Sequence, residues 1–208
     1  MVEKHDFVEL EFTGMVKDGE IFDTNVDSVA KSIGMKDSPK PLIVCIGKRM
    51  VIDGLDEFLE KKEIGKDYEV EILPEKAFGK RKKDLVKLMP AKSFLEKNIS
   101  PKPGMVLALD NYMVRIVAVS GGRVLVDFNN PLSGKEVVYK FKLKRKVDDL
   151  QEKVKAISNF FFKKEVEFEV SDKKLIFNLP ETYESLVKQL NEDFKEVLGL
   201  EITIGSKK

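Results

Sequence analysis

The chain has 208 residues, of which 42% are hydrophobic and 35% are charged, and its 37 basic residues nearly balance its 36 acidic ones. This much apolar material can form a core, which excludes general disorder, and the balanced charge excludes a protein that binds polyanions over its whole surface. The single cysteine, Cys45, excludes an intramolecular disulfide, and its place in the apolar run LIVCIG predicts a buried thiol.

The first 50 residues predict short strands separated by turns. FVELEF (7–12) has the mostly period-2 apolar pattern of a strand, and KDGE (17–20) contains the Asp-Gly pair of a tight hairpin turn. IFDTN (21–25) leaves that turn as a second strand. Residues 26–40 are polar and predict a loop with one helical turn, and PLIVCIG (41–47) predicts a continuous apolar strand.

A short helix is predicted after residue 52. Leu55, Phe58 and Leu59 form one apolar stripe at helical spacing, and Asp53 is the expected N-cap. YEVEILP (68–74) then alternates as a strand and leads into a charged loop at 75–84.

A β-rich segment with its own turn signals covers about 85–128. Asp110-Asn111 and the Ser-Gly-Gly run at 120–122 separate its strands, and AKSFLEKN (91–98) predicts one short helix. The strand that follows has its apolar residues on one face and lysines on the other; the apolar set is Val137, Tyr139, Phe141 and Leu143.

The last third predicts the order helix, strand, strand, helix, strand. Helices are expected at about 148–162 and 182–198, a hairpin is expected where VEFEV and LIFNL flank the turn SDKK, and EITI ends the pattern as a strand. A segment of about 57 residues buries too little surface to be stable alone, so we expect it to dock or to form a dimer.

The N-terminus, MVEKHDFVEL, lacks the apolar core of a signal peptide. No run of the sequence reaches the ~18 apolar residues that a membrane span needs. We therefore expect a soluble, cytoplasmic protein.

Groups that could bind a metal or act as a nucleophile are scarce. The single histidine, His5, lies far from Cys45 in the sequence, so no zinc pattern exists and no Ser-His or Cys-His pair is indicated. Asp18, Glu20 and Asp23 lack the alternating oxygens and the closing glutamate of a calcium loop. We therefore expect no metal and no cofactor, and a site that works by shape and apolarity.

Two basic stretches leave two interpretations open. KRKK (80–83) is a loop run, and Lys140, Lys142 and Lys144 lie on one face of a strand, followed by two further basic residues. These stretches are either solvated faces or a groove for nucleic acid. Because no aromatic residues lie among the lysines on the same face of the strand, as a stacking surface requires, we do not expect nucleic acid as a partner.

Several motifs in chain order resemble the FKBP-type peptidyl-prolyl isomerases. FTGMVKDGEIFDT (12–24) resembles their aromatic-Thr-Gly and Phe-Asp elements, and residues 47–79, from GKRMVIDGLDEF to KAFG, resemble their Val-Ile pair and flap. Residues 114–143, which include NNPLSGK, resemble the SlyD-like branch, in which a chaperone domain is inserted in the flap. The loop at 26–40 and the C-terminal extension resemble the archaeal long-chain members.

The resemblance and the C-terminal pattern imply an α+β fold. They imply an antiparallel FKBP sheet wrapped on a short helix, an inserted small β-rich domain, and a C-terminal αββαβ domain. The isomerase domain is expected at 1–84 and 130–148, the inserted chaperone domain at 85–129, and the C-terminal domain at 149–208. The implied function is peptidyl-prolyl cis-trans isomerisation of X-Pro bonds in folding proteins, with chaperone activity.

The resemblance also implies an apolar prolyl pocket between the sheet and the helix. Ile52 is expected to offer its backbone N–H to the substrate carbonyl, Leu55 to form the pocket floor, and Asp23 to be a polar point that orients the substrate amide. The full set of implied pocket residues is Phe12, Phe22, Asp23, Leu42, Val51, Ile52, Leu55, Phe78 and Tyr139.

The sequence departs from the family pattern at several positions. Phe12 and Phe78 stand where tyrosines are common, so Asp23 is expected to lose one hydrogen-bond partner and the substrate to lose a bond to the flap. Asn130 replaces the histidine of an NHPLAG-like motif. The histidine-rich tail of the bacterial relatives is absent from this sequence, so nickel binding is not expected.

An alternative function is a holdase without enzyme activity, which would bind unfolded chains through the inserted domain. Methionine suits a promiscuous apolar surface, although the same residues could form the insert's own core. The residues concerned are Met89, Phe94, Met105, Tyr112 and Met113. With either function, the expected partners are unfolded or proline-containing polypeptides; a homodimer through the C-terminal domain is a further expectation, and no membrane partner is expected.

Overall fold

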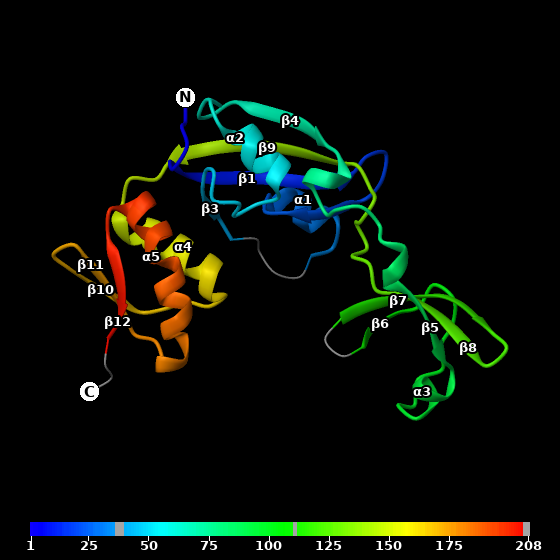
Figure 1. Cartoon of the computed structure of the whole chain (residues 1–208). Helices are drawn as coiled ribbons and strands as arrows, with labels where there is room; N and C mark the ends of the chain where they lie inside the picture. Colours follow the sequence, from blue (N-terminus) through cyan, green and yellow to red (C-terminus); the bar gives the residue numbers. More distant parts are fainter. Residues whose placement is uncertain (36–39, 110–111, 206–208) are drawn as a thin grey trace. The chain divides into compact units, whose positions relative to one another are not determined.

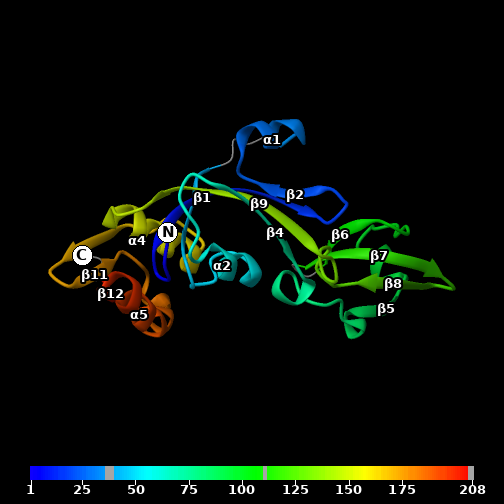
Figure 2. The same ribbon diagram turned by 90° about the horizontal axis from the view of Figure 1, so that it is seen from above.

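The computed structural model describes residues 1–35, 40–109 and 112–205. The chain forms two compact units. The first unit comprises Met1–Met15, Gly19–Val70 and Val138–Lys208, and the second comprises Val16–Asp18 and Glu71–Val137. Figures 1 and 2 show their elements from two directions.

An antiparallel sheet in the first unit is built on the long strand β1 (Phe7–Val16). The strand order is β2-β1-β9-β4, where β2 is Ile21–Thr24, β9 is Val137–Lys146 and β4 is Asp67–Ile72. Strand β3 (Leu42–Cys45) pairs with the first half of β1, and β2 pairs with the second half. The short helix α1 (Asp27–Ser32) lies between β2 and β3 in the sequence (Figure 1).

The predicted short helix, α2 (Asp53–Leu59), packs on one face of this sheet (Figure 2). Leu55 and Leu59 are fully buried, and the ring of Phe58 meets Phe141 of β9 edge-on at a centroid distance of 6.1 Å. Strand β9 alternates as predicted, because Tyr139, Phe141 and Leu143 are buried and the lysines between them are not.

The C-terminal part of the first unit has the predicted element order. Helix α4 (Leu150–Phe162) is followed by the hairpin β10 (Phe168–Ser171) and β11 (Lys174–Phe177), the short 3-10 helix η3 (Glu181–Tyr183), helix α5 (Glu184–Leu198) and β12 (Glu201–Ile204). The sheet order is β10-β11-β12, and β12 runs parallel to β11. Asp149 caps α4 by accepting a hydrogen bond from the Glu152 N–H at 2.9 Å.

The C-terminal part shares its core with the antiparallel sheet that is built on β1. Phe7 of β1 and Cys45 of β3 belong to the same buried cluster as Val154 of α4 and Phe194 of α5. The expectation that this short segment docks on the rest of the chain is therefore confirmed. Cys45 is buried, and burial raises the pKa of its thiol to about 12, as expected for a structural cysteine.

The second unit contains a four-stranded antiparallel sheet of order β5-β8-β7-β6. Its strands are β5 (Val86–Pro90), β6 (Val106–Leu109), β7 (Tyr112–Ser120) and β8 (Arg123–Asp127), and the helix α3 (Lys92–Leu95) is shorter than the sequence predicts. Two short 3-10 helices, η1 (Pro74–Lys76) and η2 (Lys83–Leu85), precede the sheet. Gly121 and Gly122 both have positive φ in the predicted turn at 120–122, whereas the predicted turn at Asp110-Asn111 lies outside the described residues.

The mixed α+β class is confirmed, and the main strands and helices agree with the predicted order. Among the described residues, no helix is both long enough and apolar enough to cross a membrane.

Candidate functional site

Three aromatic rings from three strands meet beside Gly14. Tyr139 of β9 packs against Phe12 of β1 at a centroid distance of 5.8 Å and against Phe22 of β2, edge-on, at 5.9 Å. A Cβ atom built at Gly14 would lie 2.8 Å from Phe22 Cζ and 3.1 Å from Tyr139 Cε1, so only glycine leaves room for both rings. The structure therefore brings Phe12, Phe22 and Tyr139 together, and we call these three rings the aromatic wall.

Asp23 follows Phe22 on β2 and lies opposite Gly14 in the β1–β2 pairing. Desolvation by the surrounding protein raises the pKa of the Asp23 carboxyl above its usual 3.8, and a hydrogen bond with the Thr24 backbone opposes this effect. Desolvation also raises the pKa of the Tyr139 hydroxyl, and the nearby Asp23 charge adds to that shift. Asp23 therefore lies beside the aromatic wall, and no side chain of the described residues donates a hydrogen bond to its carboxylate.

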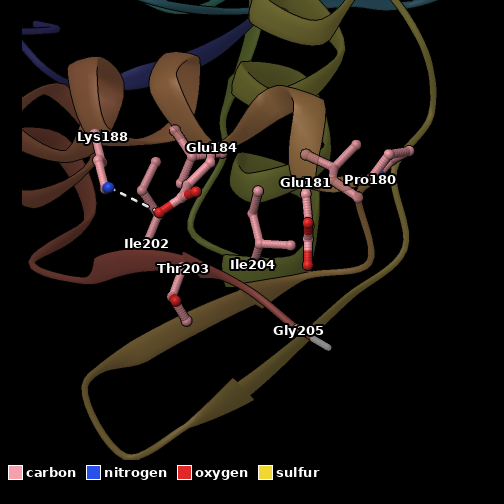
Figure 3. A pocket seen from close by; sticks show the side chains of 10 residues that line it. Pro180, Glu181, Glu184, Lys188, Ile202, Thr203, Ile204 and Gly205 are labelled. Atoms are coloured by element: carbon pink, nitrogen blue, oxygen red, sulfur yellow. Dashed lines mark ion pairs between the residues drawn. The ribbon is translucent and has the colours of Figure 1, made fainter. Parts of the chain in front are cut away.

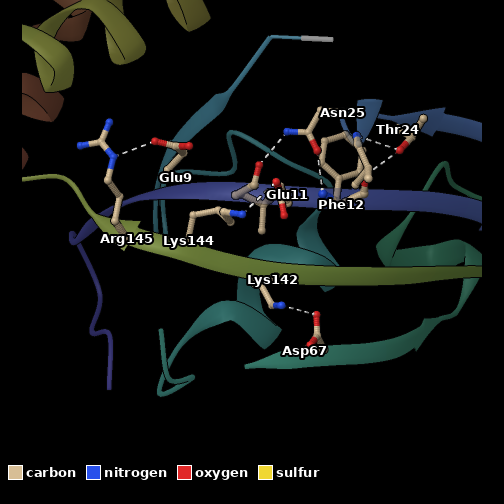
Figure 4. Close-up of polar contacts among 11 residues, drawn as sticks. Glu9, Glu11, Phe12, Thr24, Asn25, Asp67, Lys142, Lys144 and Arg145 are labelled. Atoms are coloured by element: carbon tan, nitrogen blue, oxygen red, sulfur yellow. Dashed lines mark hydrogen bonds and ion pairs between the residues drawn. The ribbon is translucent and has the colours of Figure 1, made fainter. Parts of the chain in front are cut away.

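Asn25 fills the break between β2 and β3 along the edge of β1 (Figure 4). Its Oδ1 accepts a hydrogen bond from the Phe12 N–H at 2.7 Å, and its Nδ2 donates to the Leu10 carbonyl at 2.7 Å, so the amide replaces a strand residue. Thr24 Oγ1 donates to the Phe12 carbonyl at 3.0 Å. The backbone of Phe12 is thus fixed by the two residues after Asp23. This role was not predicted from the sequence, although Thr and Asn after a strand are residue types that bond to the backbone.

Ile52 is the N-cap residue of α2, and Val51 precedes it; both side chains are half-buried. The Ile52 carbonyl accepts hydrogen bonds from the N–H groups of Leu55 and Asp56, both at 3.0 Å. The N–H of Ile52 itself donates to no acceptor among the described residues.

The predicted N-cap role of Asp53 is wrong. Asp53 is the first residue of α2 and pairs with Arg49 at 3.5 Å. The carboxylate that fixes this turn is Asp56, which is buried and accepts hydrogen bonds from the N–H groups of Gly47 at 3.0 Å and Arg49 at 2.9 Å. Asp56 therefore sets the path of the chain that leads to Ile52.

The remaining predicted pocket residues lie at three other places. Leu55 is fully buried between α2 and the sheet. Leu42 begins β3, opposite Leu10, and lines a hollow of about 520 Å³ between β3 and α4. Phe78 belongs to the second unit, so its place in the pocket stays a prediction.

The segment NNPLSGK holds the chain around Phe78 within the second unit. Ser133 Oγ donates to the Phe78 carbonyl at 3.0 Å, and the Gly134 N–H donates to the Gly79 carbonyl at 2.8 Å. Asn130, which replaces the motif histidine, accepts a hydrogen bond from the Leu132 N–H at 2.8 Å and closes a local turn. The motif thus fixes the backbone of the chain at Phe78 and Gly79 through two hydrogen bonds.

The residues predicted as a chaperone surface divide into two groups. Phe94 is 1% exposed and belongs to the core of the second unit, so its assignment to the surface is wrong, and Met89 packs against the same core. Met105, Tyr112 and Met113 are exposed. The strand pairing places Met113 and Val106 on the open face of the sheet, and Leu88 lies on the same face at the opposite edge strand, β5. The sequence did not indicate Val106 or Leu88.

The lysines of β9 are paired with carboxylates (Figure 4). Lys142 lies 3.0 Å from Asp67, and Lys144 lies 3.1 Å from Glu11. The next residue along the strand, Arg145, bonds both Glu9 and Glu152. Because these cations already have acidic neighbours, the structure favours a solvated face over a groove for nucleic acid.

A hollow of about 640 Å³ lies beside β12 in the C-terminal part (Figure 3). Its walls include Ile202 and Ile204, and its ion pair, between Glu184 and Lys188 at 2.7 Å, is exposed. Within the described ranges no group of three or more His, Cys, Asp or Glu side chains could hold a metal ion. The aromatic wall remains the better candidate, because its residues combine apolar shape with perturbed pKa values.

Comparisons with known proteins match most of the chain. A family model described as "FKBP-type peptidyl-prolyl cis-trans isomerase" matches residues 1–99, and one described as "FKBP26, IF domain" matches residues 87–132. The chain is 29% identical to the short-type peptidyl-prolyl cis-trans isomerase of Methanocaldococcus jannaschii over 147 residues. These aligned residues cover 69% of this chain and 93% of that protein.

Two SlyD proteins, both named FKBP-type peptidyl-prolyl cis-trans isomerases, are also similar. The SlyD of Aeromonas hydrophila is 30% identical over 139 residues, which cover 66% of this chain and 60% of that protein. The SlyD of Helicobacter pylori is 32% identical over 111 residues, which cover 51% of this chain and 59% of that protein. The match thus spans nearly the whole short-type relative but under two thirds of each of these SlyD proteins.

Proposed function

Because the chain belongs to the FKBP-type peptidyl-prolyl cis-trans isomerases, we propose that its aromatic wall binds the proline ring of a polypeptide substrate. The observation that carries the proposal is the meeting of Phe12, Phe22 and Tyr139 beside Gly14. Phe12 and Tyr139 are buried and Phe22 is half-buried, so the rings pack into a tight apolar surface around Gly14, which suits the apolar pyrrolidine ring of proline.

The chemistry follows from the resonance of the peptide bond. Rotation about this bond has a barrier of roughly 18–20 kcal/mol because the amide is partly charge-separated and planar. X-Pro bonds therefore exchange over tens to hundreds of seconds in solution, which is slow enough to limit folding. An apolar wall disfavours the charge-separated form and so favours the twisted amide of the transition state.

Two polar groups orient the bond in this proposal. The N–H of Ile52, which has no acceptor among the described residues, would donate to the carbonyl of the substrate, and the Asp23 carboxylate would be a charged point beside the rings. Neither group transfers a proton or forms a covalent bond. Both hold the amide in one orientation while it rotates.

The second unit supplies a chaperone surface. The open face of its sheet carries three apolar side chains that are exposed to solvent, Leu88, Val106 and Met113. Binding of an unfolded chain would remove them from water. Exposed apolar side chains can serve as interaction sites, and methionine adapts to many partners. The clients are unfolded or proline-containing polypeptides.

The two activities separate in one experiment on the full chain. Replacing Val106 and Met113 with Gln should leave isomerisation of a short proline peptide unchanged and slow the catalysed refolding of a proline-limited protein. The control replaces Leu95, which is exposed on α3, with Gln. If the short peptide is not isomerised by the wild-type chain while aggregation of an unfolded protein is suppressed, the non-enzymatic holdase is correct instead.

Assembly and location belong to the same proposal. Strand β12 is at the edge of its sheet and borders the hollow of Figure 3, which supports a homodimer through the C-terminal part. Sedimentation of the full chain over a range of concentrations tests the dimer. Cell fractionation tests a cytoplasmic location.

A further inference from the structure

We infer that the hollow between β3 and α4 binds an extended stretch of the substrate polypeptide next to the proline, an inference that rests on the proposed isomerase function. The hollow has a volume of about 520 Å³. Its apolar lining comes from β3, from the following turn and from α4: Leu42, Ile43, Met50, Ala156 and Phe160. None of the three residues of the aromatic wall lines this hollow.

Ile43 lines this hollow, and the hydrogen bonds of β1 show that its backbone polar groups face away from β1. The Asp6 carbonyl accepts from the Ile46 N–H at 3.0 Å, and the Phe7 carbonyl accepts from the Val147 N–H at 2.7 Å. Even-numbered residues of this stretch therefore bond toward β3, and odd-numbered residues bond toward β9. Glu9 pairs with Ile43, so this is a non-hydrogen-bonded pair and the polar groups of Ile43 face away from β1.

The N–H and carbonyl of Ile43 have no hydrogen-bond partner among the described residues. Cys45, the next residue with the same orientation, is satisfied by the protein. Its N–H donates to Met50 Sδ at 3.2 Å, and its carbonyl accepts from the Lys48 N–H at 3.2 Å. Strand β3 thus offers one donor and one acceptor side by side at Ile43.

The opposite wall of the hollow adds a second polar site. Asn159 of α4 lines the hollow, and its side-chain amide has no hydrogen-bond partner in the described part of the chain. Ala156, one turn earlier, is small and leaves the space between β3 and α4 open. The lining of the hollow is therefore mostly apolar, and Glu152, Lys155 and Asn159 are its polar side chains, a mixture that binding sites commonly have.

An extended polypeptide matches this arrangement better than a small apolar molecule does. Each residue of an extended chain presents its N–H and carbonyl to the same side, which complements Ile43, while alternate side chains reach the apolar lining. The family acts on polypeptides, and Leu42 is both a predicted pocket residue and part of this lining. In this inference an extended polypeptide adds to β3 as a further strand.

The test compares two peptides on the full chain. One is a proline tetrapeptide that is too short to reach beyond the prolyl site, and the other carries the same centre within about a dozen residues that alternate apolar and polar. The variant Ala156→Arg fills the hollow, and Gln151→Arg on the exposed side of the same helix is the control. Phe160→Ser is a second variant that removes part of the lining without filling the space.

We expect Ala156→Arg to raise KM for the long peptide about tenfold, with kcat unchanged and with the tetrapeptide unaffected. Phe160→Ser should raise the same KM less, and Gln151→Arg should not change it. Thermal unfolding of each variant checks that the chain is folded. If Ala156→Arg is folded and treats both peptides as the wild type does, the inference is wrong; if the wild type isomerises neither peptide, the proposed function is wrong instead.

Discussion

The ring of Phe22 covers Gly14 so closely that a Cβ atom on that glycine would lie 2.8 Å from Phe22 Cζ. Gly14 belongs to the aromatic-Thr-Gly motif of β1, and Phe22 belongs to the Phe-Asp motif of β2. The hairpin between them pairs Gly14 with Asp23. Two motifs that are separate in the sequence therefore lie side by side in the sheet and contact each other.

Replacing Gly14 with Ala should displace Phe22 and Tyr139. Because the added methyl group overlaps both rings, we expect isomerase kcat/KM to fall about tenfold and the free energy of unfolding to fall by about 1–3 kcal/mol. Peptide kinetics and chemical denaturation measure the two effects. The control is Gly65→Ala, which strains a backbone at φ +81 but meets no atom within 4 Å. It should lower stability and leave activity unchanged, and an unchanged kcat/KM in Gly14→Ala would contradict the account.

Asn25 should be needed for the position of Phe12. The variant Asn25→Ala loses the bonds to the Phe12 N–H and the Leu10 carbonyl, which are both 2.7 Å long. We expect a loss of about 1–3 kcal/mol in the free energy of unfolding, together with a fall in kcat/KM, because unpaired backbone groups are costly. Asn25→Asp keeps the acceptor and should lose less. Asn178→Ala, which removes a contact of 3.2 Å to Glu167, is the control and should change neither quantity.

Protonation of the Asp23 carboxyl should make the free energy of unfolding depend on pH. Its pKa in the folded chain lies above 3.8, so the folded chain holds this proton more tightly than the unfolded chain does. The stability from protonation is full below the unfolded pKa, and it is lost as pH rises through the folded pKa. The side chain in Asp23→Asn is uncharged at every pH. We therefore expect this variant to lack the loss of stability with rising pH, and to be at least as stable as the wild type near pH 7.

Activity of the same position is measured with the short peptide. We expect both Asp23→Asn and Asp23→Ala to lower kcat/KM without unfolding the chain, since the charge no longer orients the substrate amide. Full activity in both variants would mean that the carboxylate is only structural.

Lys48 should hold the C-terminal part against the isomerase sheet. It follows β3, is 11% exposed, and bonds Asp193 at 2.7 Å and also Glu196, both on α5. Burial acts against its charge, but the hydrogen bonds to these two acids raise the pKa of Lys48 above its usual value. We expect Lys48→Met to lower the free energy of unfolding by about 1 kcal/mol, with less effect at high salt. The control Lys31→Met removes an exposed pair with Asp27 and should cost less; equal losses would contradict the proposed role.

Periodicity predicted the elements well because each depends on which face of a strand or helix is buried. The alternation in β9 and the stripe on α2 are properties of short stretches, and so are the two C-terminal helices. The motifs also predicted three residues that do meet, Phe12, Phe22 and Tyr139.

Side-chain contacts with distant backbone could not be predicted in the same way. Asp53 and Asp56 both lie near the start of α2, and only the fold shows that the second one reaches Gly47 and Arg49. Phe94 was grouped with the methionines of the inserted domain as a candidate surface residue, yet it belongs to the core of the four-stranded sheet, which was the alternative for these residues. The role of Asn25 depends on a gap between two strands that the sequence does not mark.

Protease-coupled isomerisation of an Ala-Leu-Pro-Phe peptide tests the central claim most directly. We expect the wild-type chain to isomerise the peptide faster than buffer does and Phe22→Ala, which removes one ring of the aromatic wall, to lower kcat/KM at least about tenfold. Phe168→Ala, on β10, is the matched control and should keep full activity on this short peptide. A wild-type rate no higher than buffer, or full activity in a folded Phe22→Ala chain, would contradict the account.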